Sequence, residues 1–217
     1  MILLCIVTIF SKSTTANADD RYVKLCERYF TEFAEDYGKF GQKDGFTYLY
    51  SDKKNTATIV AIPMEQKKVA VPGKINGKTV TKIELMDVFS CSSNYYFRDE
   101  FYGEHEDNPV PKVEYLSIPK TVKVINIYAG IGLTEGYCGE LQSYLVHLKK
   151  FNVASANKWY RSYKGMLYTK NGKKLLLVPR KYMAKTVKVK KGTTKIADFA
   201  FSFCTNIKKV ILPDTVK

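Results

Sequence analysis

The lysines are the residues of this chain whose number and positions point to a chemical role. The 217 residues include 35 Lys and Arg against 21 Asp and Glu, a formal net charge of +14. Residues 145–217 hold 18 of the basic residues but only Asp198 and Asp214, a balance of +16, which leaves residues 1–144 at −2. Because the positive excess belongs to the C-terminal third, we expect that third to attract a polyanion such as teichoic acid, a glycosaminoglycan or an acidic protein surface.

The spacing of these lysines predicts that many of them share one exposed face. Lysine alternates with valine over residues 187–190, and alternate residues of a strand point to opposite sides, so Lys188 and Lys190 should lie on the same side. With other basic residues on the same or adjacent strands, the predicted ligand-binding face consists of Lys173, Lys174, Arg180, Lys181, Lys185, Lys188, Lys190, Lys191, Lys208 and Lys209. The alternative is a soluble lysine-rich surface that only keeps strand edges from aggregating.

Signatures of enzymes are nearly absent from the sequence. There is no glycine-rich phosphate loop, CxxC pair, HExxH motif or Gly-x-Ser-x-Gly elbow. His105 and His147 are the only imidazole bases, and a Cys–His nucleophile using Cys138 or Cys26 is the alternative that the sequence leaves open. A cysteine and a histidine anywhere in a chain discriminate little, so we predict no catalytic residues and no enzymatic activity.

An acidic segment at residues 95–109 could bind a hard cation such as Ca²⁺ through its carboxylates. Its charged members are Asp99, Glu100, Glu104, His105, Glu106 and Asp107. The segment lacks the regular ligand spacing and the turn glycine of a calcium loop. We therefore interpret it as a solvated surface insertion, and predict neither a metal site nor a cofactor.

The N-terminus has the pattern of an export signal. An apolar run over residues 2–10 is followed by a polar stretch and by Ala16-Asn17-Ala18, which fits the small-x-small rule of signal-peptidase cleavage. We predict a signal peptide over residues 1–18, with an N-terminal core strand as the alternative. No later apolar run is long enough to span a bilayer, so no integral membrane segment is expected in the mature chain. A secreted or cell-surface location follows, and it disfavours nucleic acid as a partner.

Three local elements are expected after residue 18. Apolar and aromatic residues spaced three or four positions apart predict an amphipathic capping helix over residues 19–43. The alternative role for its aromatic stripe is to face a membrane or a partner. Alternating apolar residues around a polar turn predict a β-hairpin at residues 44–63. A second hairpin is predicted at residues 165–179, where Asn171-Gly172 suits a tight turn.

The segment after each hairpin is duplicated within the chain. Equivalent positions are 120 residues apart at Gly45 and Gly165, 118 apart at Val69 and Val187, and 113 apart at Cys91 and Cys204. A shorter motif of two alternating apolar residues recurs at Val69/Val71, Leu116/Ile118, Val187/Val189 and Val210/Leu212, with spacings of 47, 71 and 23 residues. These are near multiples of one unit of 23 to 24 residues, within the range of leucine-rich repeats. A further, shifted copy is expected around Cys138, Leu141, Tyr144 and Val146.

These repeats resemble those of the BspA-like, or Treponema-type, leucine-rich-repeat proteins. AFSFCTNIKKVILPDTV and YLSIPKTVKVI have the phenylalanine-rich turn, the cysteine and the short strand ending in Ile-Pro of that family, and residues 151–179 resemble its inserted hairpin. The resemblance covers roughly residues 44–217, and departs from the family at 95–109 and 124–150. It implies a right-handed leucine-rich-repeat solenoid of short strands with irregular or helical turns.

The resemblance also implies a role in adhesion or protein recognition at a cell surface. We expect an exported, non-enzymatic binding protein that recognises host, matrix or cell-wall macromolecules through its basic face. The alternatives are a structural spacer of a larger surface protein, or a hydrolase with an unrecognised site. Because the last repeat reaches Lys217 without a following phenylalanine-rich turn, we expect that the natural chain continues, or that a partner or second copy covers this edge.

Overall fold

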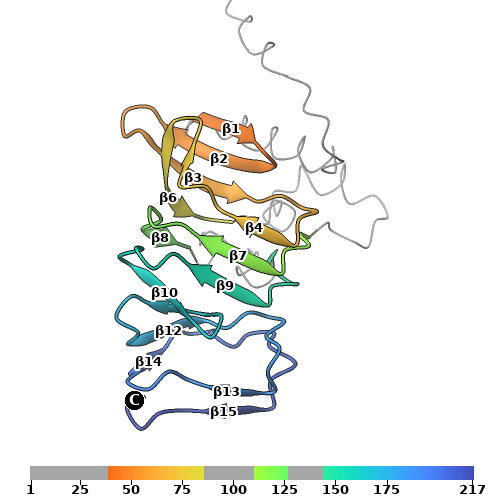
Figure 1. The fold of residues 1–217 in the computed structure, drawn as a ribbon, viewed down its shortest axis with the longest axis vertical. Helices are drawn as coiled ribbons and strands as arrows, with labels where there is room; N and C mark the ends of the chain where they lie inside the picture. The colour runs from red at the N-terminus through yellow and green to blue at the C-terminus, as the bar shows by residue number, and fades with distance from the viewer. Residues whose placement is uncertain (1–38, 86–109, 127–143) are drawn as a thin grey trace, which may run out of the picture.

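The computed structural model describes residues 39–85, 110–126 and 144–217, and the strands of these ranges stack as successive layers along one long axis (Figure 1). The first layers contain β1 (Lys39–Lys43), β2 (Phe46–Ser51), β3 (Thr56–Ala61), β4 (Lys68–Ala70), β5 (Lys74–Ile75) and β6 (Lys78–Ile83). They are followed by β7 (Tyr115–Ile118), β8 (Val124–Ile125) and β9 (Lys150–Val153). The last layers contain β10 (Tyr160–Tyr163), β11 (Met166–Thr169), β12 (Lys174–Leu177), β13 (Thr186–Lys188), β14 (Lys195–Ile196) and β15 (Lys209–Ile211).

The first sheet begins with three antiparallel strands and continues in parallel. β1, β2 and β3 pair antiparallel in that order, which places a hairpin of β2 and β3 in the range predicted for it. β3 then pairs parallel with β6, and β6 pairs parallel with β8 and antiparallel with β5. Asp44 and Gly45 form the turn from β1 to β2 at φ values of 51° and 79°, a conformation that aspartate tolerates and glycine adopts without steric cost.

Strand β1 corrects the predicted N-terminal helix. Residues 39–43 were expected to end that helix, but they form a strand paired with β2, while residues 19–38 lie outside the described residues. The physical reason is the Asp44–Gly45 turn, which folds this segment back onto β2. At Gly41 the strand passes so close to Tyr48 that an added Cβ would lie 2.6 Å from the tyrosine hydroxyl. Aromatic spacing alone predicted a helix here and missed the turn.

The second sheet repeats the first, as the sequence duplication predicted. β10, β11 and β12 pair antiparallel and β12 pairs parallel with β14, which is the order of β1, β2, β3 and β6. Lys164 and Gly165 form the equivalent turn, at φ values of 51° and 84°. Gly172, at a φ of 72°, lies in the turn between β11 and β12, where the second hairpin was predicted.

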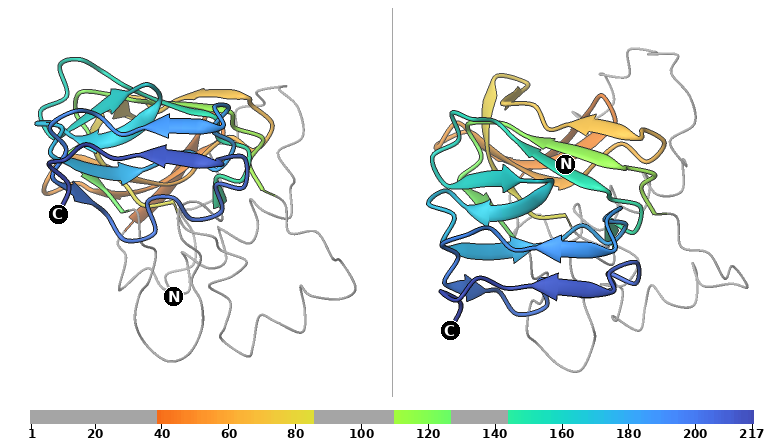
Figure 2. Two further views of the ribbon diagram at one scale, coloured as in Figure 1. Left: turned by 90° about the horizontal axis from the view of Figure 1, so that it is seen from below. Right: turned by 60° about the horizontal axis from the view of Figure 1, so that its bottom comes forward.

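Parallel strands that carry the alternating apolar motif form two further sheets. β4, β7 and β9 pair in parallel, with Val69, Leu116 and Phe151 in one register row. β13 and β15 pair in parallel, with Val187 opposite Val210. Figure 2 shows these strands as stacked rungs, with β13 and β15 near the C-terminus. These two sheets together contain five alternating apolar pairs, and four of the five were predicted from the sequence.

The repeat copy predicted around residue 146 is wrong, and strand β9 forms this rung instead. The expected copy at Tyr144 and Val146 is not a strand: residues 146 and 147 form a turn, and β9 starts at Lys150. Tyr144, Leu145 and Leu148 are instead buried beneath the sheets. Phe151 and Val153 supply the alternating apolar pair of this rung.

Among the described residues, two apolar clusters form the core. The larger one lies under the first and middle sheets, and its fully buried members include Ile59, Leu116, Leu148 and Phe151. The smaller one lies under the second copy, around Tyr168, Leu175 and Val187. The hydroxyl of Tyr168 accepts a hydrogen bond from the backbone N–H of Lys190 at 3.2 Å, which satisfies its polar end inside the cluster.

Candidate functional site

The structure places most of the predicted basic residues at the surface of the last layers. Lys173 and Lys174 lie at the start of β12, Arg180 and Lys181 follow β12, and the remaining members flank or form β13 and β15. Eight of the ten are exposed, while Arg180 and Lys190 are half-buried. Arg180 lies over the ring of Phe203, with its guanidinium carbon 4.9 Å from the ring centre. The predicted face is therefore largely accessible.

These residues divide between two sheets instead of forming one face. Lys174 lies opposite Lys195 in the β12–β14 pair, so a lysine absent from the sequence prediction belongs to this group. Lys188 and Lys209 belong to the β13–β15 pair, where Thr186 lies opposite Lys209 and Lys188 opposite Ile211. Residue counting could not reveal this division, because only the strand pairing assigns each lysine to a sheet.

Lys190 does not share the exposed face of Lys188 as predicted. β13 ends at Lys188, and the chain turns before Gly192, whose φ is 83°. The stem of Lys190 packs over Gly172, where an added Cβ would lie 3.0 Å from its Cε. Its ammonium group donates a hydrogen bond to the carbonyl of Lys191 at 3.1 Å. The alternation that predicted a common side fails because the strand is shorter than the alternating stretch.

Hydrogen bonds between rungs hold pairs of basic residues next to each other. The N–H groups of Lys208 and Lys209 donate to the carbonyl of Lys185 at 2.8 and 3.1 Å. On the other sheet, the N–H groups of Thr194 and Lys195 donate to the carbonyl of Lys173 at 2.8 and 3.1 Å. The same forked arrangement starts β7 and β9, so it is a regular feature of this stack. Adjacent rungs therefore bring lysines of distant sequence position together.

In the earlier rungs, the residues at the position of Lys185 and Lys208 form ion pairs with one another. Lys67, Glu114 and Lys149 occupy successive rungs, and the Glu114 carboxylate lies 4.0 Å from the Lys67 ammonium and 2.8 Å from that of Lys149. The hydrogen bond from Lys149 holds the pKa of Glu114 below its usual range, so this carboxyl stays ionised. In the last two rungs this position is occupied by Lys185 and Lys208, so neither of these two rungs has an acidic residue there.

The two halves of the described chain differ in their ion pairs. Every ion pair between two described residues lies before residue 150, including the double bridge from Asp52 to Lys39 and Lys78 at 2.9 and 2.7 Å. No such pair between described residues involves Lys185, Lys188, Lys208 or Lys209. We name these four residues the C-terminal lysine cluster. All four are exposed.

The remaining candidate groups offer little chemistry in the described part of the chain. Cys204 is half-buried, its thiol donates to the carbonyls of Val178 and Pro179 at 3.5 Å, and burial raises its pKa to about 11, which disfavours the nucleophilic thiolate. Cys26, Cys138 and the acidic segment 95–109 lie outside the described residues. Among the described residues, no three His, Cys, Asp or Glu side chains gather as a metal site, and no helix is long and apolar enough to cross a membrane.

Comparisons with known proteins give weak structural similarities. No family model and no curated protein matches the chain. A leucine-rich repeat protein from Eubacterium ventriosum aligns with 82% of this chain and 60% of its own, at 17% identity and a TM-score of 0.41. The pneumococcal vaccine antigen PcpA aligns with 83% and 66%, at 13% identity and a TM-score of 0.34. A leucine rich cell surface protein from Faecalibacterium prausnitzii aligns with 84% and 45%, at 17% identity and a TM-score of 0.39. The chain thus spans less than two thirds of each, and we infer its function from its own residues.

Proposed function

We propose that this chain is a BspA-like leucine-rich-repeat solenoid that binds an anionic macromolecule at a cell surface or in secreted form. The duplicated sheets, the parallel rungs and the repeated forked hydrogen bonds support the solenoid. The observation that carries the binding role is the C-terminal lysine cluster, since its four ammonium groups are exposed and form no ion pair with a described residue.

The mechanism is electrostatic attraction to a rigid surface. Strand pairing fixes the backbone of each lysine, so adjacent rungs present like charges side by side without a conformational change. Like charges on adjacent rungs repel one another, and an anion bound in front of them would reduce this repulsion. A polymer with regularly spaced negative charges would relieve this repulsion and release its condensed counterions on binding. Teichoic acid, a glycosaminoglycan or an acidic protein surface has such charges.

The salt dependence of polyanion binding tests this proposal. We expect the dissociation constant for heparin, measured by fluorescence anisotropy, to rise about tenfold or more between 50 and 300 mM NaCl, because screening and counterion release both weaken the contact. Neutral dextran of similar length is the control and should not bind. Absence of heparin binding at 50 mM NaCl would exclude the proposed role and favour a structural spacer. Binding that salt does not change would exclude the electrostatic mechanism.

A further inference from the structure

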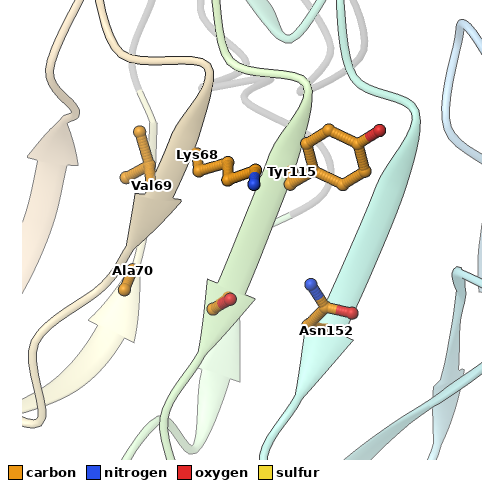
Figure 3. A pocket seen from close by; sticks show the side chains of 6 residues that line it. Lys68, Val69, Ala70, Tyr115 and Asn152 are labelled. Carbon is orange, nitrogen blue, oxygen red and sulfur yellow. The ribbon is translucent and has the colours of Figure 1, made fainter.

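A shallow hollow lies on the outward face of the β4–β7–β9 sheet. Its volume is about 490 Å³, and it is lined by Lys68, Val69, Ala70, Tyr115, Ser117 and Asn152 (Figure 3). A smaller hollow of about 300 Å³ adjoins it and shares Ser117 and Asn152. The larger volume falls within the range of small-molecule sites, roughly 300–1,000 Å³. The two hollows therefore lie side by side on the sheet.

The register of the sheet explains why the surface is hollowed there. Val69, Leu116 and Phe151 point inward and are buried, so the residues on either side of them in each strand point outward. Ala70, Ser117 and Asn152 form one outward row, and the short side chains of the first two leave space above the backbone. Figure 3 shows Lys68, the Tyr115 ring and the Asn152 amide around this space.

The polar side chains around the hollow have no hydrogen-bond partner in the part of the chain that the structure describes. The hydroxyl groups of Ser117 and Tyr115 and the side-chain amide of Asn152 form no hydrogen bond with any described residue, although all three residues are half-buried. By contrast, the neighbouring Asn157 satisfies every hydrogen-bonding atom of its amide within the protein. Half-buried donors and acceptors without a protein partner retain their hydrogen-bonding capacity for water or a ligand.

The charge at the hollow is positive. Lys68 is exposed and forms no ion pair with a described residue. Glu114, which comes immediately before Tyr115, is already paired with Lys67 and Lys149. These two lysines come immediately before Lys68 and Lys150, the first residues of β4 and β9. Because Glu114 is engaged by its two partners, it forms no ion pair with Lys68, and the Lys68 ammonium group is left for an anion.

We propose that this hollow binds one acidic sugar unit of a polysaccharide. The Tyr115 ring offers an apolar surface to the C–H face of a sugar, Ser117 and Asn152 offer hydrogen bonds to its hydroxyl groups, and Lys68 pairs with its carboxylate. The adjoining hollow offers room for a neighbouring sugar of the same polymer. The inference rests on the proposed function, because the polymer that the C-terminal lysine cluster attracts supplies the sugar; it deepens that function by naming the ligand class.

The test compares two polymers of the same charge type at 150 mM NaCl. Polygalacturonate carries a carboxylate on each sugar, and poly-glutamate carries carboxylates without any sugar. We expect wild-type protein to bind polygalacturonate about tenfold more tightly. Tyr115→Ala, which leaves the charge unchanged, should remove most of this preference, with little effect on poly-glutamate. Asn152→Asp should weaken polygalacturonate binding about tenfold by repelling the carboxylate.

Asn55→Asp is the matched control, because it makes the same substitution at an exposed turn outside the hollow and should change both affinities only slightly. Thermal melts of all variants establish that they fold. Equal binding of both polymers by the wild type, or a preference unchanged in Tyr115→Ala, would overturn the sugar site while leaving the proposed function intact. Tighter binding of poly-glutamate would identify an acidic peptide as the ligand, and would also overturn the site. Failure to bind either polymer while heparin still binds would overturn the sugar site alone, and failure to bind heparin as well would overturn both.

Discussion

The variant K185E/K188E/K208E/K209E will lose heparin affinity by about a hundredfold or more at 50 mM NaCl, because each substitution replaces an attraction to the polymer with a repulsion. The structure selects these four residues from the larger predicted face. They lie on adjacent rungs, are exposed, and form no ion pair with a described residue, so the substitutions break no ion pair between described residues. Fluorescence anisotropy with labelled heparin measures the loss.

The matched control is K43E/K53E/K54E/K74E, which changes the net charge by the same amount in the first layers. These four lysines are also exposed and also lack an ion pair with a described residue. We expect a loss of less than about tenfold, caused by the overall charge alone. Equal losses in the two variants would show that net charge, and not the C-terminal lysine cluster, determines binding.

The substitution Asn157→Ala will lower the free energy of unfolding by about 3 kcal/mol, because it leaves several buried backbone groups without partners. Asn157 is fully buried. Its amide nitrogen donates to the carbonyls of Pro119 and Val122, both at 2.9 Å, and its amide oxygen accepts from the N–H groups of Trp159 and Tyr160 at 2.9 and 2.8 Å. One side chain thus joins the turn after β7 to the start of β10. Urea denaturation of the full chain measures the effect.

Asn171→Ala provides the comparison for that measurement. Asn171 lies exposed in the turn between β11 and β12, where its amide oxygen accepts from Lys173 N–H and Thr169 Oγ, both at 2.9 Å. Water can replace these bonds, so we expect a loss of about 1 kcal/mol or less. If the two variants unfold at the same urea concentration, the Asn157 network does not join the two parts of the stack in the way described.

The alternating apolar pairs and the two glycine-containing turns made much of the fold predictable. Val69, Leu116, Val187 and Val210 were each placed in a parallel rung by a motif that reflects inward-pointing side chains. β1 was missed because the aromatic spacing of its segment also fits a helix, and only the pairing across Asp44–Gly45 distinguishes the two. The spacing of apolar residues in this short segment therefore did not distinguish a strand from a helix.

The sugar-binding hollow was missed for a different reason. Ala70, Ser117 and Asn152 are far apart in sequence and belong to residue types that suggest no chemistry alone. The strand register brings them into one row. A usable signal was nevertheless present, since each residue lies between the two apolar members of its motif. Reading that middle position in successive repeats would have listed the outward row.

Footprinting of lysines by acetylation and mass spectrometry, with and without heparin at 50 mM NaCl, tests the central claim most directly. The method reports each ammonium group separately in the unmodified sequence. We predict that heparin protects Lys185, Lys188, Lys208 and Lys209, while the four control lysines of the first layers react at the same rate in both conditions. Uniform protection of all exposed lysines, or protection confined to the first layers, would contradict a binding surface on the last rungs.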